Sequence, residues 1–73
     1  KKKKIKFSIP KSDIVQIKVY DILGKEVTTL LNEYTLAGTY EIEFFANSLP
    51  SGVYFYRIIS GIYSETKKMI LLR

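Results

Sequence analysis

The chain has 73 residues, a net charge of +5, and neither Cys nor His. This length permits one domain, and the missing residue types exclude disulfides, thiolate metal sites and the commonest general base. No stretch approaches the ~20 apolar residues of a membrane span, so we expect no span.

The positive charge is concentrated at the start of the chain. Lys1–Lys4 holds four of the twelve cations, and the remainder is nearly neutral, with 8 cations against 7 acids. Such a run is typical of an arm for phosphates or of a disordered, solubilising end. We favour the second, assign residues 1–4 to a disordered leader, and expect no nucleic-acid partner. The apolar stretch of a signal peptide does not follow, so an export signal would lie on a longer precursor.

Alternation of apolar and polar residues predicts the first two strands. Ile5, Phe7 and Ile9 share one face of a half-buried strand that ends at Pro10. After a polar turn, the second strand places Val15, Ile17 and Val19 on one face and Gln16, Lys18 and Tyr20 on the other. Asp21–Gly24 forms the next turn, where Gly24 suits a positive φ.

Residues 26–34 allow two interpretations. Val27, Leu30, Leu31 and Tyr34 have helical spacing, which indicates a short helix. We favour a third strand beginning at Lys25, because adjacent β-branched threonines disfavour a helix and a turn joins the segment to a clear strand.

Three further strands complete the predicted fold. The fourth alternates from Tyr40 to Phe44, the fifth, Val53–Ile59, is apolar at nearly every residue, and the sixth runs from Tyr63 or Ser64 to Leu72. A continuous apolar strand is usually central. Short strands at regular spacing predict an all-β fold, a small antiparallel immunoglobulin-like β-sandwich of about six strands formed by residues 5–73.

The polar residues indicate neither a catalytic nor a metal site. Glu41 and Glu43 alternate with apolar residues, as on a solvated strand face, and Asp21 is better explained by hydrogen bonds to its own turn. Oxygen ligands for calcium are not clustered, and Gly24 and Gly38 are isolated turn glycines rather than a phosphate-binding loop. We therefore expect neither an enzyme nor a cofactor.

The aromatic residues leave two interpretations open. Tyr54, Phe55, Tyr56 and Tyr63 lie close together if the fifth and sixth strands pair. Exposed, they would form a platform for sugar rings or partner proteins. We favour the alternative that they pack on both sides of the central strand.

Five sequence blocks together resemble a known family, the type A C-terminal sorting domain of the type IX (Por) secretion system of Bacteroidetes and related bacteria. The blocks are Ile5-Lys-Phe-Ser-Ile-Pro10, Val19-Tyr-Asp-Ile-Leu-Gly-Lys-Glu-Val27, Ala37-Gly-Thr-Tyr40, Leu49-Pro-Ser-Gly-Val-Tyr-Phe-Tyr-Arg57 and Lys67-Lys-Met-Ile-Leu-Leu-Arg73. Each block is weak alone, whereas five in order are fairly specific.

The resemblance implies a domain at the end of a secreted precursor, recognised by the secretion machinery after the precursor reaches the periplasm. A sortase-like protease commonly removes the domain at the cell surface, and the cargo is released or attached to lipopolysaccharide. The motif and fold positions would be Asp21, Gly24, Gly38, Gly52, Tyr54 and Tyr56. The recognition segment would be Lys67, Lys68, Met69, Ile70, Leu71, Leu72 and Arg73, because a terminal strand can pair edge-on with a receptor.

The start of the chain departs from the family pattern. Family members usually open with a proline- and asparagine-rich segment and a strand, and here Lys1–Lys4 stands in that place. If the first family strand is missing, an open sheet edge would favour self-association.

Two other functions compete with sorting. The first is a structural or assembly module, as in secreted hydrolases and the flagellar hook-capping protein, which shares a Gly-x-Tyr pattern. Leu72-Arg73 resembles the end of a precursor, which favours sorting, whereas an internal module would continue beyond it. The second is a carbohydrate-binding accessory domain that uses a tyrosine face.

Overall fold

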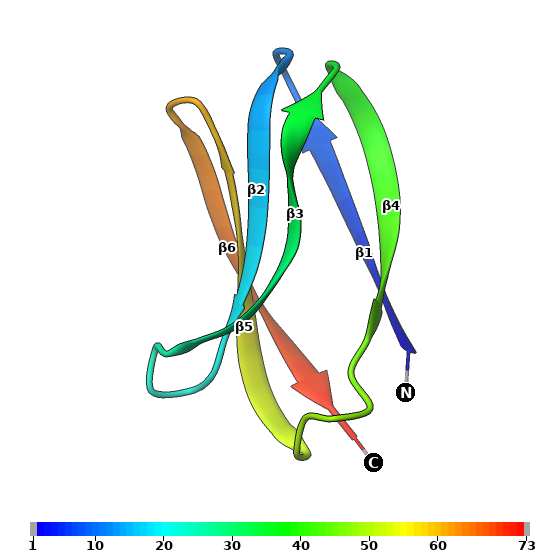
Figure 1. The fold of residues 1–73 in the computed structure, drawn as a ribbon, viewed down its shortest axis with the longest axis vertical. Helices are drawn as coiled ribbons and strands as arrows, with labels where there is room; N and C mark the ends of the chain where they lie inside the picture. Colours follow the sequence, from blue (N-terminus) through cyan, green and yellow to red (C-terminus); the bar gives the residue numbers. More distant parts are fainter. Residues whose placement is uncertain (1, 73) are drawn as a thin grey trace.

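Residues 2–72 are described by a computed structural model, and in this range the chain forms strands and no helix (Figure 1). All strand pairs are antiparallel. The strands are β1 (Lys2–Ile9), β2 (Asp13–Tyr20), β3 (Glu26–Thr35), β4 (Gly38–Phe45), β5 (Gly52–Ser60) and β6 (Tyr63–Leu71). The prediction of a small all-β sandwich with six strands is confirmed.

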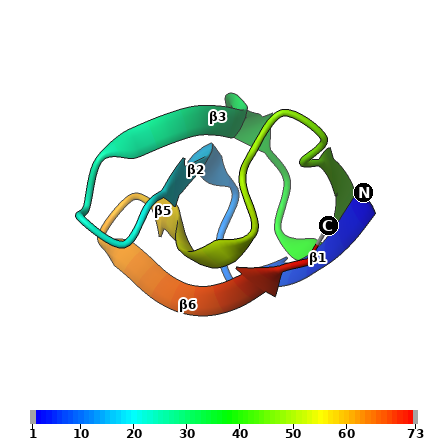
Figure 2. The same ribbon diagram turned by 90° about the horizontal axis from the view of Figure 1, so that it is seen from below.

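The strands form two sheets that pack face to face. One sheet has the strand order β3-β2-β5-β6, and the other consists of β1 and β4 (Figures 1 and 2). β5 lies between β2 and β6, as its continuous apolar sequence predicted. Each of β1, β3, β4 and β6 therefore has one edge without a strand partner in residues 2–72.

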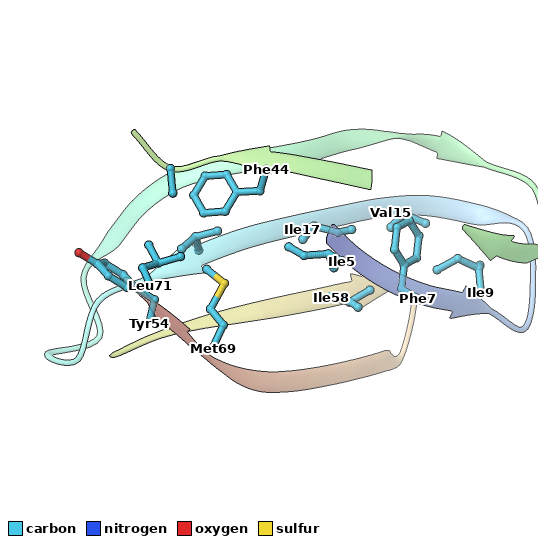
Figure 3. Close-up of a cluster of buried hydrophobic side chains, with 12 residues drawn as sticks. Ile5, Phe7, Ile9, Val15, Ile17, Phe44, Tyr54, Ile58, Met69 and Leu71 are labelled. Atoms are coloured by element: carbon cyan, nitrogen blue, oxygen red, sulfur yellow. The ribbon is translucent and has the colours of Figure 1, made fainter. Parts of the chain in front are cut away.

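The core lies between the two sheets and is formed by alternate residues of each strand (Figure 3). Val15, Ile17 and Val19 of β2 are completely buried, and Ile58 of β5 lies directly opposite Ile17. From the smaller sheet, β1 contributes Ile5, Phe7 and Ile9, and β4 contributes Phe44. The predicted inward faces of the first two strands are confirmed.

Irregular pairing explains why residues 26–34 resemble a helix in sequence. The β2–β3 register shifts twice, between Ile17 and Lys18 and between Val19 and Tyr20. Each shift leaves one extra residue on β3, Leu30 and then Val27, as in a β-bulge. Both side chains pack against the core although strict alternation would turn one of them outward. The segment is a strand, as predicted, with bulges that give it helix-like spacing.

The opening lysines differ from the prediction of a disordered leader. Lys2–Lys4 belong to β1 and pair with β4, so the leader assignment is wrong for them, whereas Lys1 lies outside the described residues. Lys4 lies opposite Glu43, and Lys2 Nζ is 3.5 Å from Glu43 Oε2. Cross-strand pairs of opposite charge stabilise a sheet, which gives part of this basic run a structural role.

Candidate functional site

The terminal strand β6 divides its side chains between the core and solvent. Met69 and Leu71 are buried and join the core, while Lys68, Ile70 and Leu72 are exposed. Two residues of the predicted recognition segment, Met69 and Leu71, therefore hold the sandwich together, and Lys67, Lys68, Ile70 and Leu72 are accessible to a receptor.

Two apolar side chains are exposed at the end of β6. Ile70 is 51% exposed and Leu72, which follows the strand, is 72% exposed. Lys67 pairs with Glu65, at 3.8 Å between Nζ and Oε2. β6 pairs only with β5, so its second edge is open to another strand in the described part of the chain. Arg73 lies outside the described residues.

Two Gly-x-Tyr sequences build the same local structure at the starts of β4 and β5. Gly38 and Gly52 open these strands at φ angles of +154° and +153°, which residues with side chains rarely adopt. The hydroxyl of Tyr54 donates a 2.8 Å hydrogen bond to the Pro50 carbonyl, four residues upstream. Tyr40 repeats this bond to Leu36. Each tyrosine thus ties the loop to the strand that follows, much like the tyrosine corner of immunoglobulin domains.

Asp21 organises the turn between β2 and β3. Its Oδ1 accepts hydrogen bonds from the backbone N–H groups of Leu23 and Lys25, at 2.9 and 3.0 Å. Gly24 adopts a φ of +84° and donates its N–H to the Asp21 carbonyl. These bonds support the structural interpretation of Asp21.

The aromatic residues do not form one exposed platform. Tyr54 is buried, and Tyr56 and Tyr63 pack against the core. Phe55 points to the other face of the sheet, where it lies opposite Tyr20. The packing interpretation agrees with this arrangement for the three tyrosines. The position of Tyr20 beside Phe55 was not predicted, because only the β2–β5 register brings the two together.

Polar groups in the described residues are not gathered into a reaction centre. Glu41 and Glu43 lie on the outer face of β4, opposite Lys6 and Lys4 of β1. No three or more acidic residues of residues 2–72 are placed to hold a metal ion. Nor does this range contain a helix with the length and hydrophobicity to cross a bilayer.

Comparison with protein families decides the identity of the domain. The model of the secretion system C-terminal sorting domain matches residues 1–72. The chain belongs to this family. Searches of curated proteins and of solved structures found no match. The resemblance in the five sequence blocks to the type IX sorting domains is thereby confirmed.

In this sorting domain, the buried tyrosine hydroxyl gives a testable prediction of stability. Tyr54→Phe should lower the free energy of unfolding by about 1–2 kcal/mol, because the Pro50 carbonyl loses its donor in a partly buried position. Tyr34, which is 60% exposed, supplies the control, and Tyr34→Phe should change stability by less than about 0.5 kcal/mol. Urea denaturation measures both values. Equal values for the two variants would contradict a structural role for the Tyr54 hydroxyl.

Tyr63 of the sorting domain gives a prediction of pH dependence. Its hydroxyl donates a 2.9 Å hydrogen bond to Glu65 Oε1, and this bond, with burial and the negative charge of Glu65, raises the pKa of Tyr63 above 10.0. The folded state then favours the neutral phenol, so this contribution to stability is complete below pH 10.0 and is lost as pH rises through the folded pKa. The NMR shift of the Tyr63 ring should have its midpoint above 10.0, and Glu65→Gln should lower it. An unmoved midpoint would exclude Glu65 as the cause.

Proposed function

We propose that the domain carries its cargo protein from the periplasm across the outer membrane through the type IX system, to the cell surface or the medium. The match to the sorting-domain family over residues 1–72 is the observation that carries this proposal. The family consists of sorting signals rather than catalysts, and we infer that this domain has no enzymatic activity of its own.

Recognition by the secretion machinery is assigned to the terminal segment, Lys67–Arg73. The open edge of β6 supports this assignment, since an edge strand offers backbone hydrogen bonds to a receptor strand. Ile70 and Leu72 add exposed apolar side chains at the same place. Because Met69 and Leu71 anchor the strand in the core, the folded sandwich presents this edge in a fixed orientation.

Removal of the domain at the surface is the second part of the proposal. By analogy with the family, a sortase-like protease would cut upstream of the sandwich and release the cargo or attach it to lipopolysaccharide. The sandwich, with β1 complete from Lys2, would leave as one unit.

Export of a reporter tests the proposal. A periplasm-directed fluorescent protein, with and without residues 1–73 at its C-terminus, is expressed in a bacterium that has the type IX system. Only the fusion should appear outside the cell, with the sorting domain removed. Equal retention of the two proteins would contradict the proposed function.

Self-association is a separate prediction from the open sheet edges. β1, β3, β4 and β6 each have one unpaired edge in residues 2–72, and such edges favour strand pairing between chains. Sedimentation velocity should show a dimer whose fraction grows with concentration. A single monomeric species at high concentration would contradict this prediction.

A further inference from the structure

Residues from the start of β1 and the end of β6 line two adjoining hollows in the surface. A hollow of about 380 Å³ is lined by Lys3, Lys4, Ile5 and Lys68, among others, and a second of about 220 Å³ extends toward Leu72. Both hollows include Lys3 and Ile70, so they form one continuous depression, here called the β1–β6 groove.

The β1–β6 groove is strongly positive. The residues that line it in the described part of the chain include four lysines and no carboxylate. Lys2 has a partner in Glu43, whereas Lys3, Lys4 and Lys68 form no salt bridge within residues 2–72. Glu65, on the same strand as Lys68, is occupied by Lys67. Lys3 and Lys68 therefore line the groove without a carboxylate partner among the described residues, and Lys4 lies opposite Glu43 without a salt bridge to it.

The backbone at the groove is also without partners. β1 pairs only with β4, and β6 pairs only with β5, so each has an edge whose alternate N–H and C=O groups meet no strand in residues 2–72. Figure 1 shows that β1 and β6 run in opposite directions. Ile70, which is 51% exposed, adds apolar surface beside the lysines. Charges, backbone edges and apolar side chains thus lie together.

We propose that the β1–β6 groove binds an acidic, extended polypeptide segment of a partner protein. The segment adds a strand to the free edge of β6 and directs its carboxylates toward Lys3, Lys4 and Lys68. Alternate side chains of an added strand point to opposite sides, so its acidic groups can lie on the outer face, which carries Lys68 and Ile70 on β6, while its apolar groups face the core. The proposal rests on the proposed function, because it names the chemistry of the partner that recognises β6.

The observations favour a polypeptide over another polyanion. A phosphorylated glycan or a lipid headgroup would neutralise the lysines but would leave the strand edge and the exposed Ile70 and Leu72 unused. An acidic strand satisfies all three features at once. Its ionic contribution should weaken with salt, since exposed charges are screened over about 8–10 Å at physiological ionic strength.

Peptide binding tests the inference with the whole chain. The probe is a fluorescent peptide of about ten residues, the length of a long strand, in which Glu alternates with Thr and Val; a second peptide has Gln in place of Glu. Fluorescence anisotropy should show affinity for the acidic peptide at least about tenfold higher than for the neutral one, as expected for several ion pairs near a protein surface. Amide NMR shifts should change along β1 and β6.

Matched charge variants locate the site. Lys3→Gln with Lys68→Gln should weaken acidic-peptide binding by about five- to tenfold. Lys11→Gln with Lys25→Gln removes the same charge from lysines outside the groove and should change binding by less than about twofold. Equal losses in both double variants, or equal affinity for the two peptides, would overturn the proposal.

Two comparisons separate the remaining outcomes. If heparin, or vesicles rich in anionic lipid, displaced the acidic peptide and bound more tightly than it does, that result would overturn the choice of a polypeptide. A peptide whose addition changes only the fraction of dimer would overturn it as well. An exported reporter fusion whose domain does not bind the acidic peptide would refute this inference and leave the proposed function intact. Peptide binding without export would refute the proposed function instead.

Discussion

Replacing Ile17 by Ala should lower the free energy of unfolding by about 3 kcal/mol, within the range of roughly 2–5 kcal/mol for buried Ile. Ile17 is fully buried at the centre of the larger sheet, directly opposite Ile58. A chain of this length typically has a total stability of roughly 4–11 kcal/mol. The absence of Cys excludes a disulfide that would compensate. A single truncation should therefore remove a large share of the stability.

Ile14, on the same strand as Ile17, gives a control. Ile14 is 51% exposed on the outer face of the same sheet, and Ile14→Ala should cost less than about 1 kcal/mol. Urea denaturation followed by circular dichroism measures both variants. Similar midpoints for the two variants would contradict the assignment of the core to the inner faces of the sheets.

Replacing both Ile70 and Leu72 by Asp should abolish export of a fused reporter while the domain stays folded. Both side chains are more than half exposed, so two carboxylates can be accommodated at little cost to the sandwich. The introduced carboxylates would remove the apolar contact with the receptor. In the proposed groove they would also repel the carboxylates of an acidic partner. Export should fall to the level of the reporter without the domain.

The turn between β2 and β3 supplies a matched control for this prediction. Ile22 and Leu23 are 70% and 90% exposed and lie in the turn after β2, outside the two hollows that Ile70 and Leu72 line. Replacing both by Asp adds the same charge, yet export should remain near the wild-type level. Loss of export in both double variants, with both domains folded, would contradict recognition through the end of β6.

The strand pattern was predictable because alternation is local. Ile5, Phe7 and Ile9 alternate with polar residues, and their strand and buried face follow directly from that spacing. The type of β3 also followed from its threonines, but its bulges did not, because a bulge depends on pairing with β2. A register that shifts twice cannot be read from one strand alone.

The role of the opening lysines required the fold. A lysine run has no apolar alternation, so composition indicates a disordered end. Pairing of Lys2 with Phe45 and of Lys4 with Glu43, distant in the sequence, places the run in a strand instead. The β1–β6 groove was hidden for the same reason, because Lys3 and Lys68 come together only in the packed sandwich.

The repeated Gly-x-Tyr structure was predictable only in part. Gly38 was expected at a turn, and Gly52 and Tyr54 were expected among the positions that shape the fold. In both segments the tyrosine hydroxyl donates a hydrogen bond to the carbonyl four residues upstream, from Tyr40 to Leu36 and from Tyr54 to Pro50. The sequence spacing is therefore the same in both. A comparison of the two segments within the sequence could have found it.

Dependence of export on the secretion machinery tests the central conclusion most directly. The reporter fused to residues 1–73 is expressed in a type IX-competent strain and in an otherwise identical strain that lacks the secretion channel, and fluorescence outside the cell is measured. We predict export in the competent strain and retention of the intact, folded fusion in the periplasm of the other. Equal export from both strains, or retention in both, would contradict a type IX sorting signal.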